Sequence, residues 1–330
     1  MTQKVDHGGD LERAMARYGG ERTAWIDLST GINPVPYPIP SVSAGAWATL
    51  PSATALDALT KAARQAYGLP DTTACTALSG AQAIIQKLPE IAPQGPVCVV
   101  EPTYNEHARV FRNAGFEVQA LPDLEALSSG VATLCLVSPN NPDGRRYTPQ
   151  ALREVAALVR LLVVDESFMD PTPDESLLAA PLPSSVLVLR SFGKFFGLAG
   201  LRLGFACGAP ELISRLSTLA GPWAVSGPAL EIGTAALNDR AWATETRQRL
   251  PQDSQRLDDV ALSAGATLVG GTPLFRTYRV EDAATAQHHL AQNKIWSRIF
   301  PYSAHWLRLG LPGSHEDWQR VESALRTLKG

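Results

Sequence analysis

The chain has 330 residues, of which 45% are hydrophobic and 18% charged, and its formal net charge at pH 7 is −3. These values favour a globular protein with a large and a smaller domain, and the scattered basic residues argue against nucleic-acid binding. No stretch approaches the roughly 18 uninterrupted apolar residues of a membrane span, and the N-terminus lacks the apolar run of a signal peptide, so we expect a cytoplasmic protein without membrane partners.

The first elements are a short helix and an irregular arm. Residues 10–19 begin with Asp10, a favourable N-cap, and end with a glycine, which predicts a short helix. A strand-like run follows at residues 25–28, and glycines and prolines then crowd positions 31–40, which excludes a helix there. Irregular segments often carry binding groups, although a plain linker has the same composition.

Two helix starts follow the arm. Residues 53–67 predict a helix that Ser52 caps and Gly68 stops. Gly80, Ala81 and Gln82 then open a second helix from a turn of small residues, where backbone N–H groups can bind a phosphate. Most such helix starts bind nothing, so this turn is weak support on its own.

Strand and helix patterns alternate between residues 96 and 207. Apolar runs predict strands at 96–100, 116–121, 132–137, 161–164, 185–189 and 203–207, with helices at 104–113 and 149–160. Because these runs show no polar alternation, we expect an α/β fold with a mainly parallel central sheet and helices on both faces. Ligands bind at the carboxyl ends of such strands, and polar groups follow the runs at residues 101–104, 138–144, 165–168 and 191–194.

The last third of the chain predicts a smaller α+β domain. We expect helices at 228–237 and 241–264, strands at 267–269 and 275–280, a helix at 283–292, strands near 295 and at 306–309, and a helix at 315–328. Pro251 should kink or interrupt the second of these helices. The predicted organisation is an arm at residues 1–45 that packs on the small domain and active site, a large domain at 46–225 and a small domain at 226–330.

Cysteines and histidines give no metal or disulfide pattern. The four cysteines are far apart in the sequence and form no CxxC pair. Cys98 and Cys135 lie in apolar runs and are expected to be buried. His288 and His289 would point about 100° apart on a helix, without an evident third ligand, so we expect a solvated helix face and no metal.

Lys194 follows an apolar strand and is flanked by glycine and aromatic residues. A desolvated lysine there can act as a neutral amine and form a Schiff base, although a solvated lysine in a surface turn would fit the same local sequence. Pyridoxal phosphate needs such an amine, a carboxylate for its pyridine nitrogen, an aromatic ring to stack on, a donor to its phenolate and an anion cradle. Candidates in that order are Lys194, Asp165, Tyr104, Asn141 and the set Gly80, Ala81, Ser191 and Arg202.

The order of these motifs resembles the fold-type I pyridoxal-phosphate enzymes of aminotransferase class I/II over nearly the whole chain. The motifs are Ser-Gly-Ala-Gln, Pro-Thr-Tyr, Asn-Asn-Pro-x-Gly, Asp-Glu-Ser-Phe, Ser-Phe-Gly-Lys and Leu-Arg-Leu-Gly. Within that superfamily, the His7-Gly8-Gly9-Asp10 opening and residues 27–34 look like the L-threonine-O-3-phosphate decarboxylases of cobalamin biosynthesis. Histidinol-phosphate aminotransferases share the core motifs but usually lack the His-Gly-Gly opening.

The resemblance implies roles for individual residues. Catalytic residues would be Lys194, which forms the Schiff base, Asp165, which pairs with the pyridinium, and Tyr104, which stacks on the ring. Cofactor contacts would come from Gly80, Ala81, Gln82, Tyr104, Asn141, Asp165, Phe168, Ser191, Lys194 and Arg202. Substrate contacts would come from His7, Gly8, Asn33, Arg298 and Arg308, although ordinary surface ion pairs would also explain the two arginines. A homodimer with a shared active site is implied as well.

Three positions depart from the family pattern. Phe168 stands where many aminotransferases have a tyrosine that contacts the phenolate, so Asn141 would make that contact alone. Leu50-Pro51 stands where a tyrosine before proline usually reaches the neighbouring subunit's cofactor phosphate. Asp143 stands where threonine is common. The first two make the cofactor site less polar, but they remove no essential group.

The function that the resemblance implies is decarboxylation of L-threonine O-3-phosphate to (R)-1-aminopropan-2-ol O-phosphate. If the bond from Cα to the carboxylate stands perpendicular to the cofactor ring, CO2 leaves; if the Cα–H bond stands there, Lys194 takes the proton and transamination follows. A histidinol-phosphate-type aminotransferase that uses 2-oxoglutarate is therefore an alternative. A non-catalytic ligand-binding relative is a third reading, and the sequence leaves the choice open.

Overall fold

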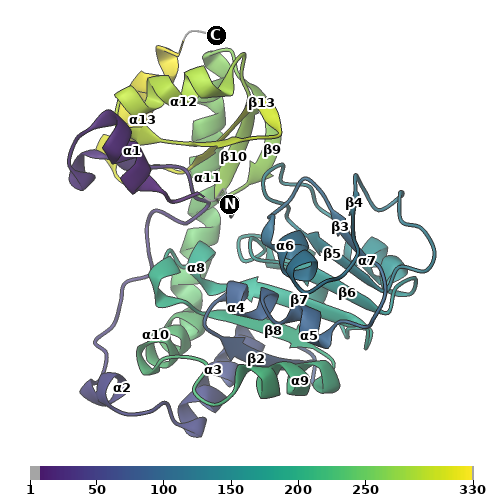
Figure 1. The fold of residues 1–330 in the computed structure, drawn as a ribbon. Helices are drawn as coiled ribbons and strands as arrows, with labels where there is room; N and C mark the ends of the chain where they lie inside the picture. The colour runs from purple at the N-terminus through teal and green to yellow at the C-terminus, as the bar shows by residue number, and fades with distance from the viewer. Residues whose placement is uncertain (1–7, 329–330) are drawn as a thin grey trace. The chain divides into compact units, whose positions relative to one another are not determined.

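The computed structural model describes residues 8–328, so His7 lies outside the described residues. Its contacts divide the chain into two compact units, shown in Figure 1. The large unit comprises Pro36–Asn141 and Arg145–Arg247, and the small unit comprises Met1–Val35, Pro142–Gly144 and Gln248–Gly330. Among the described helices, none combines the length and the apolar character that a membrane crossing needs.

The large unit is organised around a seven-stranded sheet with the order β2-β8-β7-β6-β5-β3-β4. Its strands are β2 (Ala74–Leu78), β3 (Val97–Val100), β4 (Val118–Leu121), β5 (Thr133–Val137), β6 (Leu161–Asp165), β7 (Val186–Ser191) and β8 (Gly204–Gly208). Only β8 runs antiparallel to its neighbours β7 and β2; the other pairs are parallel. Every residue of β3, β5 and β6 is buried, which confirms the predicted mainly parallel, two-sided sheet.

Helices cover both faces of this sheet (Figure 1). The helices of the large unit are α2 (Ala44–Ala48), α3 (Ala53–Ala66), α4 (Ala81–Ile85), α5 (Leu88–Ile91), α6 (Glu106–Asn113), α7 (Pro149–Ala156), α8 (Phe192–Phe195), α9 (Pro210–Ala220) and α10 (Gly227–Asn238), and not all of them lie on the sheet. Helices α4, α5, α6 and α9 share a buried cluster with Leu187 and Leu189 of β7. Helix α7 shares the other cluster with Val186 and Val188, so successive β7 side chains point to opposite faces.

The small unit holds two further sheets. Strand β1 (Ile26–Asp27) pairs in parallel with β11 (Ile295–Trp296). The antiparallel sheet has the order β12-β13-β10-β9, with β9 (Thr267–Thr272), β10 (Phe275–Arg279), β12 (Arg298–Phe300) and β13 (Ser303–Gly310). Its helices are α1 (Leu11–Tyr18), α12 (Ala283–Gln292) and α13 (His315–Arg326), and α11 (Arg240–Ser263) contributes its part from Gln248 onward.

Most predicted helix ends are confirmed, but the interruption that was one of the two expected effects of Pro251 does not occur. Asp10 caps α1 by accepting from the Arg13 N–H at 3.2 Å, and Ser52 caps α3 by accepting from the Ala55 N–H at 3.1 Å. Helix α11 runs through Pro251 without interruption. Proline removes its own N–H from the helical ladder and its ring crowds the carbonyl group four residues earlier, but the remaining hydrogen bonds of a 24-residue helix can hold it together.

The cysteines are free thiols, and Cys98 and Cys135 are buried as predicted. Cys75 and Cys207 are distant in sequence but face each other across β2 and β8, with their Sγ atoms 3.5 Å apart. His288 contacts the Tyr18 hydroxyl, whereas His289 contacts the Ala324 carbonyl oxygen. Residues 8–328 contain no cluster of His, Cys, Asp and Glu side chains suited to a metal ion.

Candidate active site

The polar residues that follow the strands of the large unit gather at the carboxyl edge of the sheet. Strands β6 and β7 are parallel neighbours with Asp165 opposite Leu189, so Asp165 and Ser191 reach the same edge. Ser191 is followed at once by α8, which holds Lys194 half-buried. The Lys194 Nζ atom lies 5.4 Å from the centre of the Phe168 ring. The structure therefore brings Lys194 and Phe168 together and places Asp165 on the adjacent strand.

Asp165 is a buried carboxylate with donors on both oxygens. Its Oδ1 accepts from the Ser167 N–H at 2.9 Å and from the Ser167 hydroxyl at 2.5 Å, and its Oδ2 lies 2.9 Å from His107 Nε2. Burial alone would raise the pKa of Asp165, but the hydrogen bond and charge of His107 and the Ser167 hydrogen bonds outweigh it and lower the pKa. Asp165 is thus held as an anion, which suits a partner for a protonated ring nitrogen.

Tyr104 belongs to a chain of hydrogen bonds that the sequence did not predict. Its hydroxyl donates to Gln82 Oε1 at 3.0 Å, and Gln82 Nε2 donates to Glu106 at 2.7 Å. Arg109 donates to the same buried Glu106 through Nε and Nη2, both at 2.7 Å. Burial, helped by the charges of Glu106 and Asp165, raises the pKa of Tyr104, so its hydroxyl stays protonated and the chain fixes its ring.

Gly80, Ala81 and Arg202 meet at the start of α4. Gly80 has a φ of 91°, and a Cβ atom there would lie 2.7 Å from Arg202 Nη2, so the position requires glycine. A Cβ atom on Gly204 would lie 2.3 Å from the Ala81 nitrogen, and Gly204 pairs with Ser191 across β8 and β7. Close backbone packing therefore places Ser191, the Gly80 turn and the Arg202 guanidinium around one spot, a suitable cradle for an anion.

Asn141 lies at the end of a segment that is anchored to the Tyr104 loop. The neighbouring Asn140 donates from Nδ2 to the Pro102 carbonyl oxygen at 2.9 Å and accepts from the Thr103 hydroxyl at 2.6 Å. Asn141 itself is half-buried. These contacts tie the segment after β5 to the loop after β3, as expected for parallel strands whose ends share one edge.

Arg308 and Arg298 are neighbours in the small unit. They face each other in the register of β13 and β12. Arg308 is 6% exposed, lies 5.1 Å from the Phe275 ring centre, and donates from Nη2 to the Ser29 carbonyl oxygen at 2.5 Å. Burial, with repulsion from Arg298, lowers the pKa of Arg308 to about 10. Arg308 is therefore no surface residue, and an incoming anion would stabilise its charged form.

Gly8 packs against Arg308, whereas Asn33 is tied to α11. A Cβ atom at Gly8 would lie 2.4 Å from the Ser29 oxygen and 3.5 Å from Arg308 Nη2. The buried Asn33 accepts on its Oδ1 atom from the Val35 N–H at 3.1 Å and from Arg249 Nη2 at 2.8 Å. Since these donors occupy the amide oxygen, the orientation of the Asn33 amide is fixed. Arg249 is a contact that the sequence did not predict.

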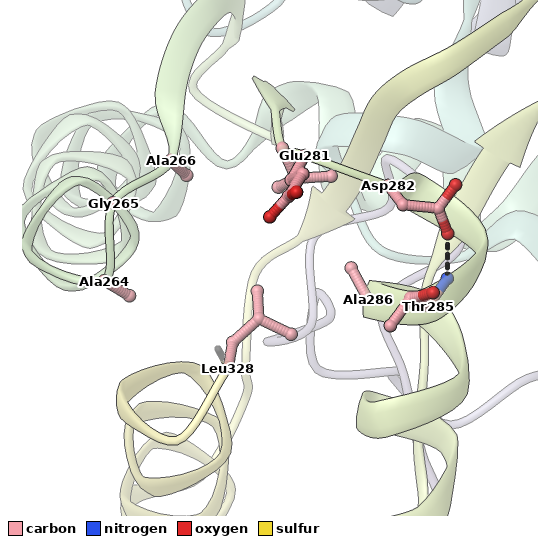
Figure 2. Close-up of a pocket in the computed structure, with 9 residues that line it drawn as sticks. Ala264, Gly265, Ala266, Glu281, Asp282, Thr285, Ala286 and Leu328 are labelled. Atoms are coloured by element: carbon pink, nitrogen blue, oxygen red, sulfur yellow. Dashed lines mark hydrogen bonds between the residues drawn. The ribbon is translucent and has the colours of Figure 1, made fainter. Parts of the chain in front are cut away.

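Figure 2 shows a separate hollow of about 280 Å³ within the small unit. Its lining comes from residues 264–266, residues 280–282, Thr285, Ala286 and Leu328. Asp282 on its wall caps α12 by accepting from the Thr285 N–H at 2.6 Å, so this carboxylate has a structural role. None of the predicted site residues lines this hollow.

Of the buried polar residues around the site, His107 and Glu106 were missed by sequence reasoning. His107 follows Tyr104 by three residues, a spacing that could have drawn attention to it because such positions lie close together on a helix. Its Nδ1 atom is buried and has no hydrogen-bond partner among residues 8–328. Glu106, its neighbour, carries no such spacing signal.

Comparison with known proteins decides the family. Residues 25–325 match the family described as aminotransferase class I and II. The chain belongs to the aminotransferase class I and II family. Two similar members are the threonine-phosphate decarboxylases of Sinorhizobium sp., 39% identical with 100% of both chains covered, and of Pseudomonas aeruginosa, 40% identical with 98% of both covered. A solved histidinol-phosphate aminotransferase from Sinorhizobium meliloti in complex with pyridoxal-5'-phosphate has the same fold, with a TM-score of 0.84 at 19% identity over 98% of this chain and 95% of that one.

Proposed function

We propose that this member of the family is a pyridoxal-phosphate-dependent carboxy-lyase that converts L-threonine O-3-phosphate into (R)-1-aminopropan-2-ol O-phosphate in cobalamin biosynthesis. The observation that carries the proposal is the full-length similarity, near 40% identity, to threonine-phosphate decarboxylases. The buried arginine of the small unit supports it, because its charged form would gain from an anionic substrate. The substrate is a phosphorylated amino acid, which carries two acidic groups.

The cofactor is pyridoxal 5'-phosphate, and the residues of the large unit fit it. The spot beside Gly80, where a Cβ atom would collide with Arg202, suits a phosphate that Gly80, Ala81, Ser191 and Arg202 would hold. Asp165 is held as an anion, as a partner of a protonated pyridine nitrogen must be. When bound, pyridoxal phosphate supplies an electron sink for the electron pair that remains at the substrate Cα after CO2 departs.

Each remaining residue of the large unit has a proposed role. Lys194 would hold the cofactor aldehyde through Nζ and, once the substrate has replaced it, return a proton to the substrate Cα. Tyr104 would stack on the ring, with Gln82 fixing its hydroxyl. Asn141 would donate to the phenolate oxygen, and Phe168, beside Lys194, would offer an apolar wall in place of a second donor.

The small unit would hold the substrate's acidic groups. Arg308 would bind the α-carboxylate and Arg298 the phosphate, with His7, Gly8 and Asn33 closing over that phosphate. A Cβ atom at Gly8 would lie 3.5 Å from Arg308 Nη2, so this segment of the arm lies near the arginine proposed for the α-carboxylate. Which bond at Cα breaks depends on how Arg308 orients the carboxylate, and this orientation separates a decarboxylase from an aminotransferase.

We also propose a cytoplasmic homodimer with a shared active site. The support is a group of large apolar side chains in one segment: Ile39, Trp47 and Leu50 are 63%, 72% and 65% exposed. Neighbouring exposed apolar side chains are typical of a protein-protein interface. The proposed domains remain an arm at residues 1–45, a cofactor domain at 46–225 and a small domain at 226–330.

The test is a comparison of two substrates with one purified protein. We expect CO2 release from threonine phosphate, and no glutamate from histidinol phosphate with 2-oxoglutarate. The opposite result would make the protein a histidinol-phosphate-type aminotransferase. The matched variant Lys194→Ala should lose both the reaction and the visible absorbance band of the bound cofactor; if that band persisted, Lys194 would not be the residue that holds the aldehyde.

A further inference from the structure

Two pairs of adjacent residues lie at the ends of the neighbouring strands β6 and β7, with Glu166 directly after the last residue of β6. They are Asp165-Glu166 and Arg190-Ser191. Adjacent residues of a strand point to opposite faces, so Asp165 faces α6, where it meets His107, and Glu166 faces the other side, where it meets Ser176. Arg190 shares this second face, because it alternates with Leu189. At the end of each strand, one residue therefore lies on the face of the sheet that α6 covers, and one charged residue lies on the opposite face.

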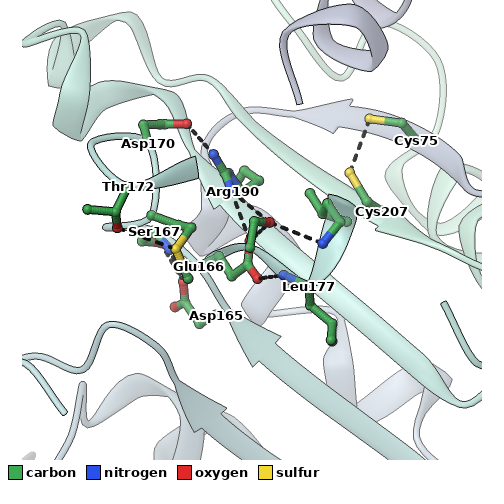
Figure 3. Close-up of polar contacts among 12 residues, drawn as sticks. Cys75, Asp165, Glu166, Ser167, Asp170, Thr172, Leu177, Arg190 and Cys207 are labelled. Atoms are coloured by element: carbon green, nitrogen blue, oxygen red, sulfur yellow. Dashed lines mark hydrogen bonds and ion pairs between the residues drawn. The ribbon is translucent and has the colours of Figure 1, made fainter. Parts of the chain in front are cut away.

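Arg190 joins two buried carboxylates behind the sheet (Figure 3). Its Nη1 donates to Glu166 Oε2 at 2.8 Å, and its Nη2 donates to Asp170 Oδ1. Glu166 also accepts from the Ser176 hydroxyl at 2.5 Å and the Leu177 N–H at 2.8 Å. The exposed fractions of the Arg190, Glu166 and Asp170 side chains are 2%, 0% and 4%. The guanidinium further lies 4.4 Å from the centre of the Tyr67 ring.

The two carboxylates are the ends of a short buried loop, residues 166–170. The loop turns through a hydrogen bond from the Met169 N–H to the Glu166 oxygen at 3.0 Å. Between its ends, Ser167 holds Asp165 by two hydrogen bonds and Phe168 lies beside Lys194. One guanidinium therefore fixes both ends of the loop whose middle residues contact the residues proposed to hold the cofactor.

We propose that Arg190 is a positioning residue of the cofactor site, which acts through Glu166 and Asp170 on the placement of Asp165 and Phe168. This inference rests on the proposed function, since it concerns the same cofactor. Stability alone does not explain the presence of this charged cluster, because apolar residues of similar volume often replace a buried ion network without loss of folding stability. An arginine suits the cluster because the donors of its planar guanidinium reach two carboxylates in a fixed geometry, which the single ammonium group of a lysine does not reproduce.

The experiment titrates the cofactor-free, full-length protein with pyridoxal phosphate and records the dissociation constant, the visible spectrum as a function of pH, and the melting temperature. For Arg190→Lys we expect the dissociation constant to rise about tenfold and the pH midpoint of the spectrum to move. Asp170→Asn keeps the shape of the side chain and removes one charge, so it should fold even if Arg190→Lys does not. It should weaken cofactor binding about threefold.

The matched control is Arg276→Lys in the small unit. Arg276 also holds a buried carboxylate through a fork, with Asp258 at 2.9 and 2.6 Å. This control should lower the melting temperature and leave the dissociation constant unchanged. Unchanged binding and spectra in Asp170→Asn and in every folded Arg190 variant would overturn the inference and leave the proposed function standing. Absence of pyridoxal phosphate binding by the wild type would overturn both.

Discussion

In the large unit, buried charges face protein groups that favour them, whereas in the small unit the best-buried arginine of the site faces another arginine. At Asp165, burial is opposed by His107 and Ser167, and the net result is a lowered pKa. At Arg190, burial is opposed by Asp170 and Glu166, and the pKa is raised. At Arg308, burial and Arg298 lower the pKa, and the opposing effects of Tyr302 and Asp27 do not outweigh them.

This difference separates two kinds of binding site. The pKa of Asp165 is lowered before any cofactor is bound, so in its proposed role it would already be the anion that a protonated ring nitrogen needs. The charged form of Arg308 instead becomes more favourable when a negative group approaches, which couples the arginine to the arrival of an anionic substrate. Changes in the large unit should therefore affect the cofactor, and changes at Arg308 should affect the substrate.

The largest expected effect comes from Asp165→Asn. The amide keeps the shape of the side chain but cannot stabilise a protonated ring nitrogen, so we expect kcat with threonine phosphate to fall about 10²- to 10³-fold. Steady-state kinetics at saturating cofactor measure it. Asp258→Asn, a similarly buried carboxylate of the small unit, serves as the control and should retain most of its kcat. A loss under about threefold in Asp165→Asn would contradict the role of this charge.

The next effect concerns Arg308→Lys. Lysine keeps the positive charge but loses the fork that matches a carboxylate, so we expect kcat/KM to fall about 10- to 100-fold, mainly through KM. The dissociation constant of pyridoxal phosphate, measured by titration, should stay within about twofold of the wild type. Equal losses of cofactor and substrate affinity would contradict the proposed assignment of the cofactor to the large unit and of the substrate to the small unit.

A smaller effect should appear in the pH dependence of stability. Because the pKa of Asp165 lies below its ordinary value of 3.8 in the folded protein, the ionised carboxyl contributes stability above that value and loses it as the pH falls through the lower, folded pKa. The stability advantage of the wild type over Asp165→Asn should therefore be constant near neutrality and shrink below about pH 4. Urea unfolding of both cofactor-free proteins measures this difference in stability. A wild-type advantage that increased towards acid pH would contradict the lowered pKa of Asp165.

The smallest effect is expected from Gln82→Leu, which removes the link between Tyr104 and Glu106. Loss of these two hydrogen bonds should weaken pyridoxal phosphate binding about threefold. Gln86→Leu is the matched control, because Gln86 lies farther from Glu106, at 3.4 Å. If the control had the larger effect, the chain through Gln82 would not be what positions Tyr104.

The sequence predicted the buried strands well because their apolar runs have no polar interruption. It missed β2, which is only half-buried along its first three residues, and β12, which is three residues long. Helix α9 was missed although Pro210 stands at its first position, where proline is favourable. Short or half-buried elements depend on neighbours that are far away in the chain, so their own residues carry a weak pattern.

The residues of the candidate site also differ in how far the sequence predicts their positions. The positions of Lys194, Asp165 and Ser191 near the sheet edge could be predicted because each lies within five residues of the end of an apolar run, and parallel strands end at one edge. The burial of Glu106 and Arg190 could not be predicted, because it results from packing of α4, α6 and the loop after β6. His107 had its spacing of three residues from Tyr104 as a signal, but its contact with Asp165 depends on the same packing. In the sequence, Glu106 and His107 look like the polar first turn of an amphipathic helix, and Arg190 looks like the end of a strand.

The pairing of β1 with β11 bears on how the protein is made. Ile26 of β1 pairs with Ile295 of β11, and the small unit is assembled from the first 35 residues, a short internal segment and the end of the chain. At ordinary rates of translation, roughly 10–60 s pass between the synthesis of β1 and the synthesis of β11, its pairing partner. Every residue of the large unit's sheet emerges during this interval. Synthesis therefore favours folding of the large unit before all segments of the small unit are available.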